Sequence, residues 1–257
     1  RPLFWRTGFT NRRRLWPLAP KFEGWGKHVS DFNMLLDGYR RFRSDTYNRQ
    51  RARYDALSHI GQSPGIMVIA CCDSRVDPTV IFDAEPGQIF VVRNVANLVP
   101  SFQAQGNHFG STSAALEFAV LGLKVEHIVV LGHAQCGGIH AAIEGDFDED
   151  SAEPGRFNYI GRWMSLIRPT RDKVMAAYRI MPDMDPQRAL EQAAIRQSLE
   201  NLRSFPFVDA AIRAGSLALH GAYFGIADGI LHILSGDMER FEPVTLDWEH
   251  PTEQPEA

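Results

Sequence analysis

Short apolar runs, separated by turn signals, are the clearest pattern in this chain. Residues 66–72, 89–95 and 127–133 are apolar and rich in β-branched side chains, and each run is bounded by Gly, Pro or polar residues. Runs of this length without alternation are typical of strands that are buried on both faces. Two more strands are expected in "LALHGAYFGIADGILHILSG", on either side of the tight link "ADG".

Helical patterns occupy the segments between and after these runs. In residues 31–58 apolar side chains recur at intervals of three and four, and Ser and Thr at the start of 110–123 favour an N-cap. Residues 136–145 begin a helix directly after the third strand, and 157–204 contain several helices, the clearest with Asp185 as its N-cap. Strands and helices that alternate with short links predict an α/β fold, in which helices flank a parallel sheet.

The composition excludes several classes of protein. Hydrophobic residues make up 44% and charged residues 23% of the 257 positions, and the net charge is -4, which gives no sign of nucleic-acid binding. The longest apolar runs are far too short to span a membrane, so neither nucleic acid nor membrane is an expected partner. Three cysteines are too few for a disulfide framework, and we therefore expect a reducing, cytoplasmic compartment.

The two ends of the chain differ from its centre. Before Glu23 the sequence has six cations and no acid, and it lacks the apolar core of a secretory signal. We expect a basic arm that packs on the domain or on a partner subunit, with an organelle transit peptide as the alternative. The expected division is an arm over 1–30, a single domain over 31–245 and a tail over 246–257. The acidic stretch 146–156 does not have EF-hand spacing and is expected to be a solvated loop.

The adjacent cysteines of "IACCDSRVDP" are the first candidates for chemistry. Side chains of a strand alternate between its faces, so Cys71 and Cys72 point to opposite sides, and we expect Cys72 to be a small buried residue. Cys71 shares the carboxyl edge of the sheet with His133 and Cys136, whose His-x-x-Cys spacing lets both side chains converge. This Cys₂His set leaves a fourth zinc position for water or substrate. A structural zinc site and three unrelated residues are the alternatives.

Asp73 and Arg75 stand beside this set. A carboxylate and a guanidinium form a bidentate pair, which would keep Asp73 ionised and away from a metal ion. In that position the carboxylate could accept a proton from metal-bound water. A plain salt bridge is the alternative interpretation of the pair.

Together these motifs resemble the β-class carbonic anhydrases. The resemblance rests on "Cys71-x-Asp73-Ser74-Arg75", on "His133-x-x-Cys136-Gly137" and on the stretch "FVVRNVANLVP" at 90–100. It implies Zn²⁺ bound by Cys71, His133 and Cys136, a catalytic dyad of Asp73 and Arg75, and a mostly parallel sheet of about four strands with an added edge strand. It also implies a homodimer or higher homo-oligomer with active sites near the subunit interface, which the basic arm would wrap.

The sequence most resembles the plant-type branch of that family, which implies a set of pocket residues. Those expected to bind substrate are Gln62, Phe90, Val95 and Gly137. Phe118 falls where that branch has a pocket Tyr, so the corresponding hydroxyl is missing. His108 and His140 are possible proton shuttles, although surface residues without such a role are the alternative for each.

The resemblance implies reversible hydration of CO₂ to bicarbonate and a proton, by attack of zinc-bound hydroxide that the Asp73–Arg75 dyad orients. Three alternatives remain open. The same scaffold could hydrolyse CS₂ or COS, with pocket access as the deciding feature. A zinc- or bicarbonate-binding regulator without activity would be expected to lack Asp73 or Arg75, and both are present. A structural zinc module would need a fourth protein ligand.

Overall fold

The computed structural model describes residues 31–103, 110–145 and 158–245. The chain divides into two compact units, residues 1–60 and 61–257, which are considered separately here. The expected arm, the acidic loop and the C-terminal tail lie outside the described residues. The domain boundaries expected at residues 30 and 245 adjoin those segments and stay predictions.

The described part of the first unit is helical, as the spacing of its apolar residues predicts. Its elements are α1 (Phe32–Arg41), the π-helical turn η1 (Phe42–Thr46), α2 (Tyr47–Arg49) and α3 (Arg51–Ile60). The Asp31 carboxylate accepts a hydrogen bond from the backbone N–H of Asn33 and so caps α1. Within the described residues no side chain of these helices is buried, and Phe32, Leu35 and Tyr39 are at least 60% exposed.

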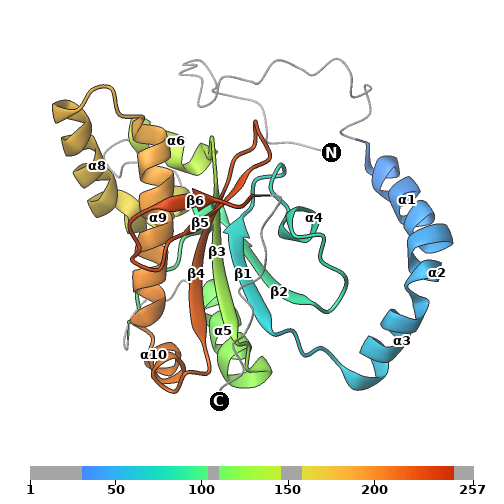
Figure 1. Cartoon of the computed structure of the whole chain (residues 1–257). Coiled ribbons are helices and arrows are strands. Elements are labelled where there is room, and N and C mark those ends of the chain that lie inside the picture. Colours follow the sequence, from blue (N-terminus) through green and yellow to red (C-terminus); the bar gives the residue numbers. More distant parts are fainter. Residues whose placement is uncertain (1–30, 104–109, 146–157, 246–257) are drawn as a thin grey trace, which may run out of the picture. The chain divides into compact units, whose positions relative to one another are not determined.

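The second unit is built on one six-stranded sheet of order β2-β1-β3-β4-β5-β6 (Figure 1). Its strands are β1 (Ile66–Cys71), β2 (Ile89–Asn94), β3 (His127–His133), β4 (Ala218–Phe224), β5 (Leu231–Leu234) and β6 (Phe241–Pro243). The first four are parallel to one another, and β5 and β6 are antiparallel. The expected α/β sheet is therefore confirmed, but its added edge has two strands instead of one.

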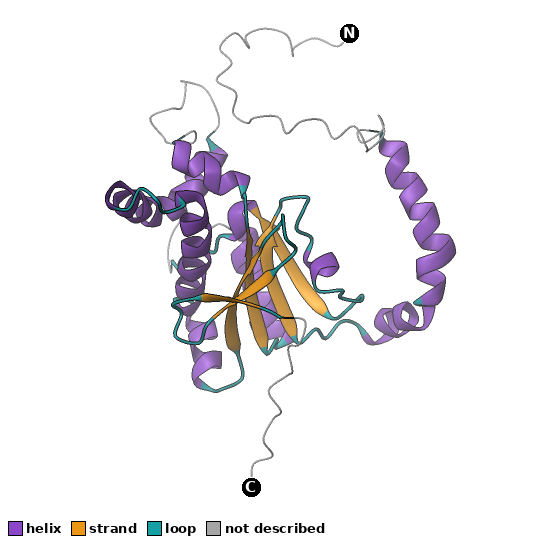
Figure 2. Cartoon of the chain, turned by 45° about the horizontal axis from the view of Figure 1, so that its top comes forward, coloured by secondary structure: helices purple, strands orange, loops and turns teal. Residues whose placement is uncertain are grey.

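Helices cover the sheet and connect its strands (Figure 2). They are α4 (Pro78–Ile81), η2 (Val95–Asn97), α5 (Gly110–Glu117), η3 (Phe118–Leu123), α6 (Gly137–Glu144), α7 (Tyr159–Met164), η5 (Ser165–Ile167), α8 (Arg168–Ile180), α9 (Pro186–Arg203) and α10 (Pro206–Arg213). The Asp185 side chain accepts from the N–H of Arg188, so the predicted cap of α9 is confirmed. Among the described residues, no helix combines the length and the apolar character that a membrane crossing requires.

The alternation of strand side chains divides the core between the two faces of the sheet. Met67 and Ile69 of β1 pack on one face, with apolar residues of α5, α9 and α10. Val68 and Ala70 point the other way and pack with residues of the neighbouring strands and with Ile81 and Phe82 at the end of α4. Because β1 and β3 are parallel neighbours with both faces covered, their carboxyl ends are held at one buried edge of the sheet.

Candidate metal centre

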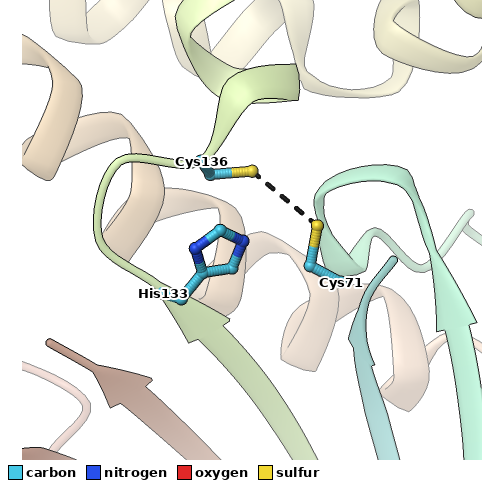
Figure 3. Close-up of side chains that lie close together, drawn as sticks. All are labelled: Cys71, His133 and Cys136. Carbon is cyan, nitrogen blue, oxygen red and sulfur yellow. Dashed lines mark hydrogen bonds between the residues drawn. The ribbon is translucent and has the colours of Figure 1, made fainter. Parts of the chain in front are cut away.

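The three predicted ligands meet at that edge. Cys71 is the last residue of β1, His133 is the last residue of β3, and Cys136 is the N-cap of α6. Their ligand atoms all lie within 4.8 Å of one another, and the three residues are at most 5% exposed. Figure 3 shows the imidazole and both sulfurs turned toward a common point. Two neighbouring strand ends and one helix start therefore create the cluster.

The distance between the two sulfurs fits a shared metal ion. Cys71 Sγ lies 3.9 Å from Cys136 Sγ. Two thiolates bound tetrahedrally at the usual zinc–sulfur length of about 2.3 Å would lie about 3.8 Å apart. The chain thus holds the two sulfurs at the spacing that such an ion requires.

The His133 ring is oriented by a single hydrogen bond. Its Nδ1 lies 2.9 Å from the carbonyl oxygen of Ala134 and donates to it, which leaves the lone pair on Nε2. Nε2 is buried and is one of three buried side-chain atoms in the described residues without a hydrogen-bond partner. A buried acceptor without a partner is costly, and a metal ion would satisfy it.

The two thiols have different acidities. A hydrogen bond from Cys136 lowers the pKa of Cys71 to about 4. The same contact raises the pKa of Cys136 well above its ordinary value, and burial adds to the increase. Cys71 is therefore already a thiolate near neutral pH, and metal binding would displace the proton that Cys136 retains.

Asp73 and Arg75 form the expected bidentate pair beside the cluster. Arg75 Nε lies 2.9 Å from Asp73 Oδ1, and Nη2 lies 2.7 Å from Oδ2. These bonds lower the pKa of Asp73 to about 2. Arg75 Nη2 also donates to the carbonyl oxygen of Gln135, at 3.0 Å, so the pair is tied to the turn between His133 and Cys136.

The prediction that Cys72 is buried is wrong. Its side chain is exposed, because β1 ends at Cys71 and the next residue has left the covered part of the sheet. The backbone of Cys72 still donates to the carbonyl oxygen of Asn94, at 2.9 Å, but no element of the described part of the chain covers the thiol. In the described residues Cys72 belongs to no group of three or more potential metal ligands.

Arg93 of β2 is a residue that sequence reasoning missed. Its guanidinium donates to the carbonyl oxygens of Cys71, at 2.9 Å, and Asp73, at 2.7 Å. It also pairs with the Asp77 carboxylate, at 2.8 Å. Arg93 thereby fixes the segment that carries one ligand and the Asp73–Arg75 pair. An arginine directly after four apolar residues of a strand was the available signal.

Glu191 of α9 was also missed. It is 3% exposed and accepts hydrogen bonds from Cys136 N, Gln187 Nε2 and Tyr223 Oη. Burial raises its pKa, while the three donors oppose that change. A charged residue among the apolar positions 190, 194 and 195 of the helix was the signal in the sequence.

The expected pocket residues fall into two groups. Val95 starts η2 and Gly137 starts α6, both close to the ligand segment. Phe90, in contrast, pairs with Met67, whereas Cys71 pairs with Asn94, four strand residues or about 13 Å further along. Gln62 precedes β1, at the opposite end of that strand from Cys71. Within one chain, Gln62 and Phe90 are therefore not brought to the metal centre.

Three further candidates lie outside the cluster. Phe118, in place of the expected Tyr, is 51% exposed, and its ring centroid lies 5.9 Å from that of Phe90. His140 of α6 is exposed, with Nδ1 3.3 Å from the side-chain oxygen of Gln187. His108 lies outside the described residues. A proton-shuttle role for either histidine stays a prediction.

Comparison with known proteins agrees with this geometry. Residues 66–231 match the family model described as carbonic anhydrase. Over 197 residues the chain is 38% identical to β carbonic anhydrase 5, chloroplastic, of Arabidopsis thaliana. That match covers 77% of this chain and 62% of the relative, so the chain spans less than two thirds of the relative's length.

Solved structures show the same architecture. The β-carbonic anhydrase CcaA has a TM-score of 0.73 and 28% identity, covering 86% of this chain and 93% of that one. A Coccomyxa β-carbonic anhydrase in complex with acetazolamide has a TM-score of 0.65 and 28% identity, covering 80% and 87%. One of two tetrameric β-carbonic anhydrases from Sordaria macrospora has a TM-score of 0.62 and 27% identity, covering 79% and 96%. On the sheet, the ligand cluster and these matches, the chain belongs to the β-class carbonic anhydrase family.

Proposed function

We propose that this protein catalyses the zinc-dependent, reversible hydration of CO₂ to bicarbonate and a proton. One observation carries the proposal. A buried Cys₂His cluster, in which the Nε2 atom of His133 has no protein partner, lies beside an Asp–Arg pair at the carboxyl edge of the sheet. Three protein ligands are the number typical of catalytic zinc, whereas structural sites have four.

Cys71, His133 and Cys136 would hold the metal ion. When bound, Zn²⁺ supplies Lewis acidity, which brings the pKa of a coordinated water toward neutral. The buried walls around the three ligands exclude bulk solvent from their side of the cluster. In such surroundings the charges of the nearby side chains act more strongly than they would in water.

Asp73 would accept a hydrogen from the attacking water. With a pKa of about 2 the carboxylate is charged throughout the neutral range, and it can only accept. Oδ1 already accepts bonds from the backbone N–H and Nε of Arg75, whereas Oδ2 accepts one from Nη2 and retains a lone pair for the water. Arg75 also prevents the carboxylate from turning onto the metal, because such a turn would break these three bonds.

The substrate pocket would need a second copy of the chain. Val95 and Gly137 lie near the ligands, but Gln62 and Phe90 lie toward the other end of the strands. We infer that a partner subunit brings its own Gln62 and Phe90 to the pocket, where an amide donor and an apolar wall suit CO₂. The tetrameric state of the Sordaria macrospora relatives supports a homo-oligomer.

Substitution of the ligands tests the proposal, and the chain offers a matched control. Cys71→Ser is expected to lose zinc and CO₂ hydration, because a hydroxyl is a poor zinc ligand at neutral pH. Cys72→Ser is the same change one residue later, at an exposed position, and is expected to keep both. Zinc content by atomic absorption and stopped-flow CO₂ hydration measure the two properties. Hydration by zinc-free Cys71→Ser would contradict the proposal, and a parallel sulfide-release assay with CS₂ and COS tests the alternative substrates.

A further inference from the structure

A buried carboxylate lies behind the metal centre and has no part in the proposed reaction. Glu191 is on α9, whose neighbouring buried positions, Leu190, Ala194 and Ile195, are apolar and pack in the core. A buried carboxylate is costly unless hydrogen bonds satisfy it. Its partners therefore indicate what the residue does.

The contacts of Glu191 and its neighbour Gln187 converge on the backbone of one residue, Cys136. Glu191 Oε1 accepts from the backbone N–H of Cys136, at 2.9 Å. Gln187, one turn earlier on α9, donates from Nε2 to the same oxygen, at 2.6 Å, and to the carbonyl oxygen of Cys136, at 3.0 Å. Side chains of α9 thus hold both backbone polar groups of a metal ligand.

The other carboxylate oxygen is fixed to the sheet. Glu191 Oε2 accepts from the Tyr223 hydroxyl, at 2.8 Å. Tyr223 lies on β4 and pairs with Gly132 of β3, the residue directly before His133. The carboxylate therefore connects the helix start that carries Cys136 to the strand next to the one that carries His133.

The segment between these two ligands needs such support. Gln135 has a φ of 55°, in the left-handed region that a side chain of L configuration seldom adopts. The turn is held by Ala134 N, which donates to Phe224 O at 2.9 Å, and by the bond from Arg75 to Gln135 O. The hydrogen bonds from side chains of α9 to Cys136 fix the C-terminal end of this turn.

We propose that Glu191, assisted by Gln187, is a positioning residue that fixes the backbone of Cys136 and so keeps its sulfur in place for the metal. The inference rests on the proposed zinc site. Hydrogen bonds to the supports of metal ligands are commonly worth about 10- to 100-fold in metal affinity. The wild-type protein should therefore lose zinc more slowly than variants that lack these hydrogen bonds.

Zinc release from the full-length holoprotein to an excess of a chromogenic chelator tests this role. Glu191→Ala is expected to release zinc at least about tenfold faster than the wild type. Glu191→Gln is expected to stay within about threefold, because its amide oxygen can still accept from the Cys136 N–H. Glu200→Ala makes the same truncation at an exposed position of α9 and should release zinc at the wild-type rate.

The absorption band of thiolate-bound Co²⁺ provides a second readout, which reports ligand geometry independently of activity. We expect the band to shift or weaken in Glu191→Ala and to be retained in Glu191→Gln. A Glu191→Ala protein with a lower melting temperature but wild-type zinc release and an unchanged cobalt band would overturn the proposal, since Glu191 would then only stabilise the fold.

Gln187→Ala is a second variant, which tests the same role if Glu191→Ala does not fold. Gln187 is half-buried, and its truncation removes the bonds to Cys136 O and Glu191 together with the contact to the exposed His140. About threefold faster zinc release would support the role, and an unchanged rate would overturn it. Zinc release and the cobalt band report metal binding and do not depend on CO₂ hydration. If the wild type hydrates no CO₂ while zinc release responds as expected, the proposed function fails and the positioning role stands.

Discussion

At the scale of single residues, the metal centre depends on how each donor atom is prepared. The bond from His133 Nδ1 to Ala134 O leaves Nε2 free to bind a metal. Cys71 is a thiolate near neutral pH because Cys136 donates to it. Asp73 is kept ionised and in place by three bonds from Arg75, two from its guanidinium and one from its backbone N–H. Cys71 and Asp73 therefore carry the charge that their proposed roles require, whereas Cys136 would lose its proton to the metal.

Asp73→Asn tests the role of the carboxylate. The amide keeps the shape of the side chain but is a weaker acceptor than a carboxylate, so kcat/KM for CO₂ hydration should fall by about 100-fold while zinc stays bound. Arg75 holds the pKa of Asp73 at about 2, and lowering pH protonates it only near that value. The loss should therefore be the same from pH 6 to pH 9. Turnover close to that of the wild type would contradict the proposed role.

The sequence predicts the donor residues better than it predicts their supports. Cys71, His133 and Cys136 could be selected because a short spacing and two strand ends suffice to bring them together. Cys72 is exposed because β1 ends one residue before it. The periodicity of a sequence does not define the residue at which a strand ends. Glu191 belongs to the site only because α9 packs behind Cys136, some 55 positions away in the sequence.

At the scale of elements, the close approach of α9 to the sheet positions the site. Gly132 of β3 precedes His133, and Ile195 of α9 packs directly against it. A Cβ atom at Gly132 would lie 2.7 Å from Ile195 Cδ1, in a fully buried region. The lack of a side chain at Gly132 is therefore what allows helix and strand to lie so close together.

Gly132→Ala is expected to destabilise the fold by about 1–3 kcal/mol, because the added methyl group would overlap the fully buried side chain of Ile195. Gly65→Ala is the control: a Cβ there meets nothing within 4 Å, and the cost should stay within about 0.5 kcal/mol. Urea unfolding of both variants measures the difference. Equal stability of the two would show that α9 can move away from β3.

The order of elements was predictable because strands and helices alternate, each with its own periodicity. The sequence did not predict β6, which is three residues long, ends in Pro243 and pairs only with β5. So short a strand has no period to detect. The pairing order and the antiparallel direction of the edge depend on contacts between distant segments.

At the scale of the whole molecule, the proposed substrate pocket is not completed by the residues of one chain. Phe90 lies near Phe118 and not near the ligands, and Gln62 lies before β1. The family resemblance implies that Gln62 and Phe90 bind substrate. The sequence alone does not indicate whether they belong to the same subunit as the zinc ligands or to its partner. The sheet register places Phe90, and the start of β1 places Gln62, away from Cys71 of their own chain.

Mixed oligomers test whether the copies share a pocket. Cys71→Ser lacks a zinc ligand, and the double variant Gln62→Ala/Phe90→Ala lacks the pocket side chains, so each alone should be nearly inactive. In a mixed dimer, one site would combine intact ligands with an intact partner pocket, and about half of the wild-type activity should return. Activity equal to the sum of the two separate variants would mean that each chain builds its site alone.

The most direct test of the central claim is the dependence of CO₂ hydration on zinc. The protein is stripped of metal with a chelator, zinc is added back in steps, and hydration is followed by stopped flow. The account predicts that activity is lost on stripping and rises in proportion to bound zinc, up to one ion per chain. Hydration by the metal-free protein, or full zinc uptake without hydration, would contradict it.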